Sequence, residues 1–107
     1  MKVTIYFGGS FCINSSKFVN IYLNGELVGW SNWYGKMKLK HVPEGESTVE
    51  IEGWWRKKIR FTASQNVKIW AREYDGEIQT LIRGEDVKIL EIEAIKLKTI
   101  NHLLEDG

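Results

Sequence analysis

The clearest structural signal in the sequence is FVNIYLNGELVGW, residues 18–30. Residues 18–23 are rich in β-branched and aromatic side chains, and the dipeptide Asn24-Gly25 follows them directly. Both central residues of a type I′ turn need a positive φ, which asparagine and glycine tolerate, so this dipeptide is the strongest short-range signal for a hairpin. Residues 26–30 then form the returning strand. The stretch therefore predicts a β-hairpin.

The same alternation with a period of two runs through most of the chain. Further strands are expected over residues 2–7, 36–41, 48–52, 56–61, 67–72, 78–83 and 87–93. The breaks between them are expected at residues 8–10, 31–35, 43–46, 53, 75–76 and 84–86, where glycine or proline favours a turn. Residues 87–105 also fit a helical stripe. We favour a strand at 87–93, because the preceding turn makes a hairpin, and then a short helix or a frayed tail over Thr99–Glu105.

Seven to nine short strands with glycine-based turns are typical of an all-β fold, a small antiparallel β-sandwich or barrel. A chain of 107 residues is the size of one domain, so residues 1–107 are expected to form a single β domain.

Charge complementarity suggests a register in the middle third. Placing Lys38 opposite Glu50 also places Lys36 opposite Glu52. On the other side of the acidic strand, Glu50 then faces Arg60 and Glu52 faces Lys58, with the apolar residues matched underneath. The sequence thus predicts a three-stranded meander in which an acidic strand lies between two basic ones.

Composition argues against several classes of function. Fifteen Lys and Arg residues balance fourteen Asp and Glu residues, so nucleic acid is the less favoured partner, with Trp54–Arg60 as its best local case. No apolar run approaches 18 residues, so no membrane partner is expected. The N-terminus lacks the apolar core of a signal peptide, and Cys12 is the only cysteine; a cytoplasmic location is expected.

Catalytic chemistry finds little support. The candidates His41, His102 and Cys12 lie in no pattern with the spacing of metal ligands or of a nucleophile and its base. The pair Glu50 and Glu52 could serve as glycosidase carboxylates, but basic neighbours explain them better. We therefore predict no enzyme, no metal and no cofactor.

Five tryptophans are many for 107 residues. The usual interpretation is that they cap the ends of the sandwich. The sharper one is a recognition surface, because aromatic side chains are enriched at binding hot spots and stack on sugar rings. Trp70 is expected apart from this surface, on a strand face shared with Lys68 and Arg72. The predicted binding residues, which the register brings to one end of the sheet, are Trp30, Trp33, Tyr34, Trp54, Trp55 and Arg56.

Residues 18–61 resemble a PEGA-type domain. The resemblance rests on the strand, Asn-Gly turn and glycine-ended strand of residues 19–29, and on the Pro43–Gly45 turn that introduces a strand followed by Gly53-Trp54. The usual Thr-Pro after the second strand is replaced by residues 30–34. The resemblance implies a small non-catalytic β-sandwich, similar to carboxypeptidase-regulatory modules, and supplies no catalytic residues.

The hypothesis we favour is a non-catalytic module that binds a protein partner, or a second copy of itself, through the aromatic end patch. The alternative is a carbohydrate-binding module that uses the same tryptophans. A small enzyme or a nucleic-acid binder is the third hypothesis.

Overall fold

A computed structural model describes residues 1–10, 18–53, 55–74 and 77–96. This part of the chain contains strands and turns and no helix. The strands are β1 (Val3–Ser10), β2 (Phe18–Leu23), β3 (Glu26–Asn32), β4 (Lys36–Leu39), β5 (Gly45–Glu52), β6 (Trp55–Ala63), β7 (Val67–Tyr74), β8 (Glu77–Gly84) and β9 (Lys88–Lys96).

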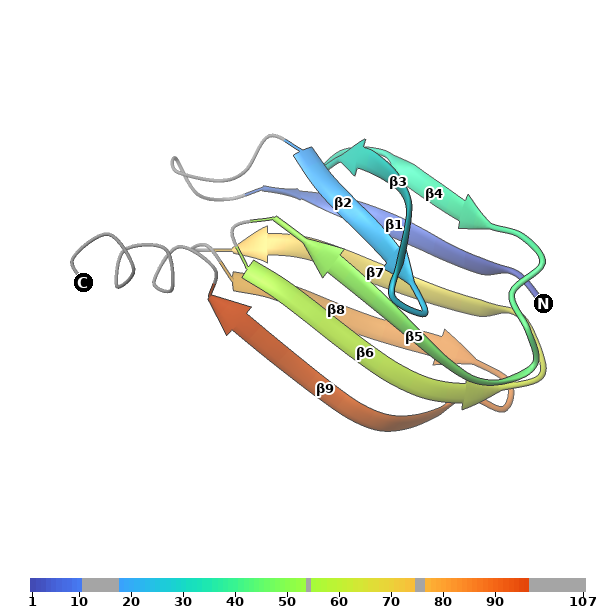
Figure 1. The fold of residues 1–107 in the computed structure, drawn as a ribbon. Coiled ribbons are helices and arrows are strands. Elements are labelled where there is room, and N and C mark those ends of the chain that lie inside the picture. The colour runs from blue at the N-terminus through green and yellow to red at the C-terminus, as the bar shows by residue number, and fades with distance from the viewer. Residues whose placement is uncertain (11–17, 54, 75–76, 97–107) are drawn as a thin grey trace.

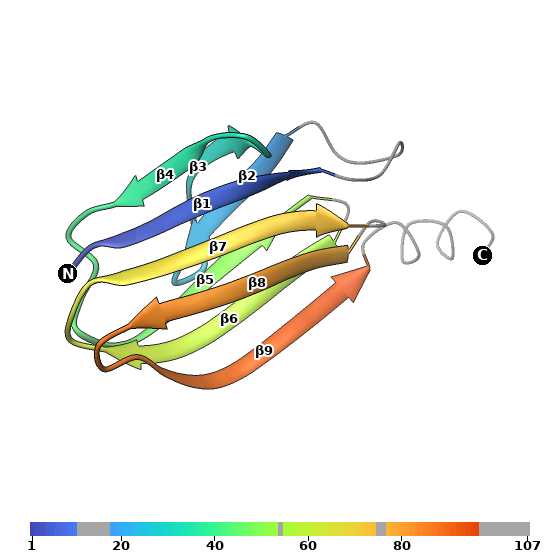
Figure 2. The same cartoon turned by 180° about the vertical axis from the view of Figure 1, so that it is seen from behind.

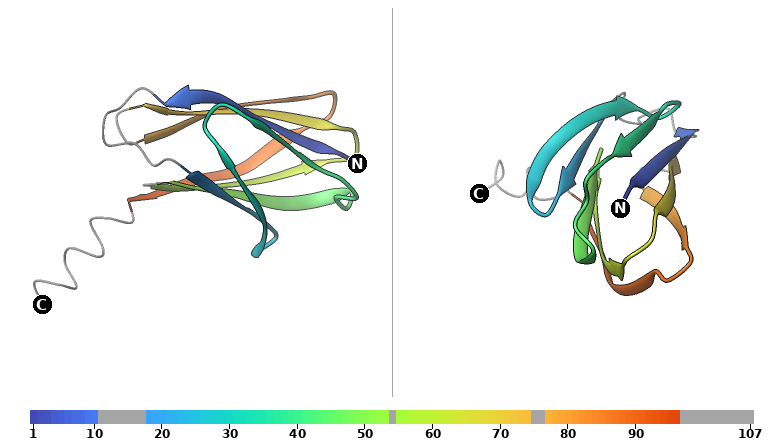
Figure 3. Two further views of the ribbon diagram at one scale, coloured as in Figure 1. Left: turned by 90° about the horizontal axis from the view of Figure 1, so that it is seen from above. Right: turned by 90° about the vertical axis from the view of Figure 1, so that its right-hand side faces the viewer.

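The strands form two sheets that pack face to face, which confirms the predicted β-sandwich (Figures 1 and 3). The four-stranded sheet has the order β4-β1-β7-β8 and is seen from its outer side in Figure 2. The five-stranded sheet has the order β3-β2-β5-β6-β9. Neighbouring strands are antiparallel except for β1 and β7, which run parallel, so the four-stranded sheet is mixed.

The core lies between the sheets and follows the alternation of the strands. Buried residues alternate with more exposed ones along most of β1, β2, β5 and β7, as the period-two pattern predicts. The four-stranded sheet contributes Val3, Ile5, Phe7, Leu39, Val67, Ile69, Ala71 and Ile78; the five-stranded sheet contributes Val19, Ile21, Val49, Ile51, Ile59, Phe61 and Ala63; Trp33 and Val42 enter from connections.

The predicted hairpin of residues 18–30 is confirmed. Asn24 and Gly25 have φ values of 51° and 85°, as a type I′ turn requires. The turn is tied to β5, because the Thr48 N–H donates to Asn24 Oδ1 at 2.8 Å and the Asn24 N–H donates to the Thr48 carbonyl oxygen at 2.8 Å. This hairpin is therefore anchored to the centre of its sheet.

The predicted break at residues 8–10 is wrong, since β1 continues to Ser10. The reason is that residues 33–35 run beside it and accept its hydrogen bonds: the Phe7 N–H donates to the Gly35 carbonyl at 3.0 Å, and the Gly9 N–H donates to the Trp33 carbonyl. Gly9 has a φ of 96° and absorbs a register shift. The two glycines bend the strand without ending it.

The predicted pairing of residues 36–39 with the acidic strand is also wrong. β4 pairs with β1 in the other sheet, where Lys36 lies opposite Tyr6 and Lys38 opposite Thr4. This pairing places Met37 opposite the fully buried Ile5. Alternation fixes which side chains of a strand point inward, but it does not select the neighbouring strand.

The predicted pairing of β5 with β6 has the right faces and a register that is wrong by two residues. Glu50 lies opposite Lys58 and Glu52 opposite Arg56. A shift of two residues keeps each side chain on its face, so acids still meet bases. On its other side the acidic strand pairs with β2 instead of a basic strand, and Asn20 lies opposite Glu52.

The last described strand resolves the alternatives for residues 87–96. Lys88–Lys96 form β9 along the edge of the five-stranded sheet, so the strand is confirmed there and the helical stripe is wrong. The predicted turn at Asp75-Gly76 and the predicted helix or tail at Thr99–Glu105 lie outside the described residues.

Candidate functional site

The predicted aromatic end patch is only partly on the surface. Trp33 is 1% exposed and packs in the core, with its ring edge against Phe7 at a centroid distance of 5.8 Å. Its prediction as a surface binding residue is therefore wrong. The physical reason is that residues 33–35 connect β3 in one sheet with β4 in the other, and this crossing carries the indole between the two layers.

The other predicted residues have different environments. Trp30 and Tyr34 are exposed, at 65% and 77%. Trp55 is half-buried and packs against the core, and Arg56 is half-buried in a polar network. Trp54 lies outside the described residues. Surface aromatics thus remain at Trp30 and Tyr34, and partly at Trp55.

Strand register places two of the predicted segments on one row of the sheet. Trp30 lies opposite Asn20, Asn20 opposite Glu52, and Glu52 opposite Arg56. Three strand spacings of about 4.8 Å separate the backbones of Trp30 and Arg56 by roughly 14 Å. Trp30 and Arg56 therefore share a row through β2 rather than through β4. The predicted joint patch of residues 30–34 and 53–55 stays a prediction.

Trp30 belongs to an exposed apolar surface that we call the hairpin patch, made of Phe18, Leu27, Val28 and Trp30. Their exposed fractions are 58%, 56%, 41% and 65% in that order. The Phe18 and Trp30 rings pack edge to face at 5.4 Å and, with Asn20, line a hollow of about 270 Å³. Sequence reasoning missed Phe18, although it shares the outer face with Asn20 by simple alternation.

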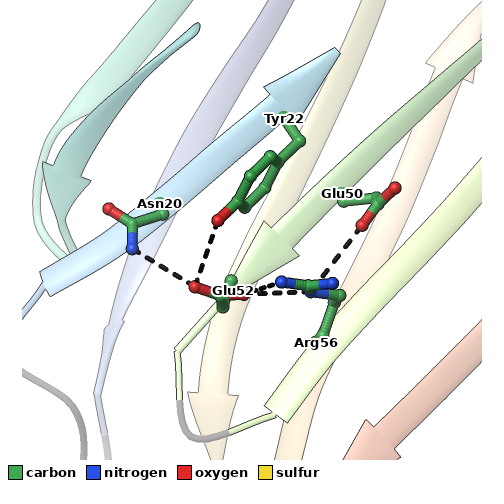
Figure 4. A network of polar contacts seen from close by, with 5 residues as sticks. All are labelled: Asn20, Tyr22, Glu50, Glu52 and Arg56. Carbon is green, nitrogen blue, oxygen red and sulfur yellow. Dashed lines mark hydrogen bonds and ion pairs between the residues drawn. The ribbon is translucent and has the colours of Figure 1, made fainter. Parts of the chain in front are cut away.

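A polar network lies beside the hairpin patch on the same face (Figure 4). Glu52 accepts hydrogen bonds from both Nε (2.9 Å) and Nη2 of Arg56, from Asn20 Nδ2 at 3.3 Å and from the Tyr22 hydroxyl at 3.4 Å. Glu50 lies 3.7 Å from Arg56 Nε, and the guanidinium carbon lies 5.1 Å from the centroid of the Tyr22 ring. Arg56 thus holds both carboxylates and one aromatic ring.

Glu52 and Arg56 stabilise each other in their charged forms. Burial favours a higher pKa for the Glu52 carboxyl, but hydrogen bonds from Arg56, Asn20 and Tyr22, together with the charge of Arg56, bring its pKa below the ordinary value. The hydrogen bond to Glu52 raises the pKa of Arg56. A carboxyl that stays ionised and saturated with donors is suited to fixing its neighbours rather than to donating a proton as a general acid.

The remaining candidates for chemistry are dispersed. His41 is exposed, with a φ of 60°, while Cys12 and His102 lie outside the described residues. Within residues 1–10, 18–53, 55–74 and 77–96, no three His, Cys, Asp or Glu side chains gather as metal ligands would. None of the described residues forms a helix able to cross a bilayer.

Comparisons with protein-family models, curated proteins and solved structures found no match. The resemblance of residues 18–61 to a PEGA-type domain therefore stays a prediction.

Proposed function

We propose that this chain is a non-catalytic interaction module in which β3 and the hairpin patch take up a further β-strand, contributed by a second copy of the chain. The observation that carries the proposal is an open sheet edge next to four exposed apolar side chains. Among the described strands, β3 is the outermost of its sheet and pairs with β2 alone. Its outer edge can add a strand through main-chain hydrogen bonds.

The sequence of β3 supports pairing rather than protection. Edge strands are usually protected by lysine, proline or inward-pointing charges. After its first residue, Glu26, β3 carries no charge and no proline, whereas β4 carries Lys36 and Lys38. The other edge of the same sheet, β9, carries Lys88, Glu91, Glu93 and Lys96. Two copies of β3 can thus meet without bringing like charges together.

Light scattering across a wide range of protein concentration tests this proposal. The wild-type chain is expected to change from monomer to dimer as concentration rises. Leu27→Lys is expected to weaken the dimer about 10- to 150-fold, because burial of a leucine side chain is worth about 1.5–3 kcal/mol.

The matched control is Leu81→Lys, the same substitution on the other sheet at a similar exposure of 50%. It is expected to leave the dimer unchanged. A chain that stays monomeric at every concentration overturns the proposal. Equal weakening by both substitutions overturns the assignment to the hairpin patch.

One observation favours a second candidate function, glycan binding. The hollow between Phe18, Asn20 and Trp30 offers an aromatic wall beside an amide that already faces the Glu52 network. Sugar rings need this combination of an aromatic surface with fixed hydrogen-bonding groups.

Titration of the protein with a panel of oligosaccharides, followed by intrinsic tryptophan fluorescence, tests this second candidate function. Binding is expected to change the emission of the wild type and to be lost in Trp30→Ala, but not in Trp70→Ala. A flat response across diverse glycans would rule this candidate out.

A further inference from the structure

The outer face of the four-stranded sheet is basic. Figure 2 shows β4, β1 and β7 side by side in this sheet. Because β4 pairs with β1 in this order, the registers place Lys36 and Lys38 on the face that carries Lys68, Trp70 and Arg72. The exact registers create one row across all four strands, Lys36–Tyr6–Trp70–Leu81, and a second row, Lys38–Thr4–Lys68–Arg83. The cations of this face are Lys36, Lys38, Lys68, Arg72 and Arg83.

These cations differ from those of the other sheet. On the five-stranded sheet, Arg56 pairs with Glu50 and Glu52, and Arg60 pairs with Glu46 and Glu91. Among the described residues, no carboxylate forms an ion pair with Lys36, Lys38, Lys68 or Arg83. Within the described strands of this sheet, alternation places one acid on the outer face, Glu77 at the start of β8. The net charge of the whole chain is only +1, but its positive charge is concentrated on this face.

Aromatic rings lie in the middle of the cations. Tyr6 and Trp70 stack with centroids 5.3 Å apart and an angle of 17° between their planes. Trp70 is 39% exposed, so part of its ring is open to a ligand. Beside it lies a hollow of about 300 Å³, whose lining includes Gly8, Arg72, Gln79 and Leu81.

The hollow is shaped by small and planar groups. Gly8 contributes no side chain, so the backbone of β1 is exposed there next to Arg72. Arg72 Nε donates to Gln79 Oε1 at 2.8 Å, and its guanidinium carbon lies 5.9 Å from the centroid of the Tyr74 ring. The guanidinium plane is thus held in place beside Trp70.

This arrangement matches what single-stranded nucleic acid needs. Such chains are bound by cations that contact the phosphates and by aromatic faces on which bases stack. Paired bases of a duplex are not free to stack on a protein ring. A lipid surface would favour apolar side chains that project from the face; Leu81 and Tyr74 project there, whereas Trp70 rests on Tyr6 and is 39% exposed, which suits a stacked base.

We propose that the outer face of the four-stranded sheet binds single-stranded nucleic acid, with a base stacked on Trp70 and phosphates on the two rows of cations. Lys36, Lys38, Lys68 and Arg83 provide the phosphate contacts, and Arg72 with Gln79 borders the base. This function is independent of strand addition at β3, which lies on the other sheet.

The test is fluorescence anisotropy of a labelled short oligothymidylate at several salt concentrations. The logarithm of the affinity is expected to fall linearly with that of the salt, with a slope of about −0.7 for each phosphate contacted, or about −3 for four contacts. Trp70→Leu is expected to reduce the affinity about 5- to 150-fold, as loss of one stacked base would.

Matched variants separate this face from the rest of the molecule. Lys68→Ala is expected to lower the salt slope by about 0.7, whereas Lys58→Ala, on the outer face of the other sheet, leaves it unchanged. Trp30→Leu is expected to bind like the wild type. An abasic oligomer of the same length is expected to bind more weakly than oligothymidylate, and equally to the wild type and to Trp70→Leu.

Three results would overturn the proposal. The first is no binding of oligothymidylate even at low salt. The second is equal affinity of the wild type and Trp70→Leu for oligothymidylate, together with unchanged salt slopes in Lys68→Ala. The third is binding to phosphatidylserine vesicles but not to the oligomer, which would assign the face to a lipid surface instead.

Discussion

Glu52 is the residue on which the polar network beside the hairpin patch depends, and Glu52→Gln tests that dependence. The substitution keeps the size of the side chain and removes its charge. A glutamine amide accepts at one atom only, so its NH2 group would face either the Arg56 guanidinium or the Asn20 amide and Tyr22 hydroxyl that donate to the other Glu52 oxygen. In either orientation the hydrogen bonds to a charged acceptor are lost. The Glu52 side chain is 17% exposed, so water replaces little of what is lost.

The magnitude follows from the contacts. A hydrogen bond to a charged group contributes about 1.5–3 kcal/mol, and this is the expected loss in free energy of unfolding. For a domain of this size, a loss of 1 kcal/mol lowers Tm by about 4–8 °C. Urea unfolding followed by tryptophan fluorescence is expected to show a midpoint lower by roughly 1 M, given an m value of about 1–3 kcal/mol/M.

The effect has a defined dependence on pH. The pKa of Glu52 is lower in the folded chain than its ordinary value, so its contribution to stability is complete above the ordinary pKa. The contribution is lost as the pH falls through the lower, folded pKa. The difference between wild type and Glu52→Gln is therefore expected to be large at about pH 7 and to shrink toward about pH 3.

The control is Glu46→Gln, which removes an exposed carboxylate that contacts only Arg60 among the described residues. Exposed ion pairs contribute little, so its midpoint is expected to lie close to that of the wild type. Equal midpoints for Glu52→Gln and Glu46→Gln, or a Glu52→Gln effect that does not change with pH, would show that the ionised Glu52 carboxylate does not stabilise the fold.

Three further outcomes are expected. Trp33→Ala should lower the free energy of unfolding, measured with urea, by about 3–5 kcal/mol, because it leaves a cavity at a buried site. Trp30→Ala should leave the urea midpoint nearly unchanged. A larger loss for Trp30→Ala than for Trp33→Ala would contradict the burial assigned to Trp33. Gly25→Ala should cost roughly 1 kcal/mol through its φ of 85° alone, since no atom lies within 4 Å of the added methyl group; an unchanged Tm would refute the type I′ turn. Asp86→Asn should lower Tm at about pH 7 more than at about pH 3, because hydrogen bonds from the Ser64 hydroxyl and from the Ser64 and Gln65 N–H groups lower the Asp86 pKa; an equal shift at both pH values would argue against these bonds.

Local patterns in the sequence predicted the strands and their faces well. The Asn24-Gly25 turn and the alternation of β2, β5 and β7 depend on neighbouring residues only, and each is found in the structure. Which strands pair is a property of the whole fold. The parallel pairing of β1 with β7 joins residues more than sixty positions apart, and no local signal marks it.

The pairing of β4 shows how a prediction from local patterns can assign the wrong neighbouring strand. From the sequence alone, Lys36 and Lys38 can form ion pairs with Glu50 and Glu52. That arrangement pairs strands that follow one another in the sequence. In the structure, Arg56 satisfies the same carboxylates, and β4 is free to cover the edge of β1. This one correction moves two lysines to the face of Trp70 and creates the basic surface that overall charge had argued against.

The central claim about function is that β3 is a site of strand addition. Hydrogen exchange of the β3 amides that make no hydrogen bond to β2, measured at low and high protein concentration, tests it most directly. We expect these amides to exchange more slowly as the protein concentration rises, whereas in Leu27→Lys they exchange at the low-concentration rate throughout. Exchange rates of these amides that are the same at every concentration would contradict it.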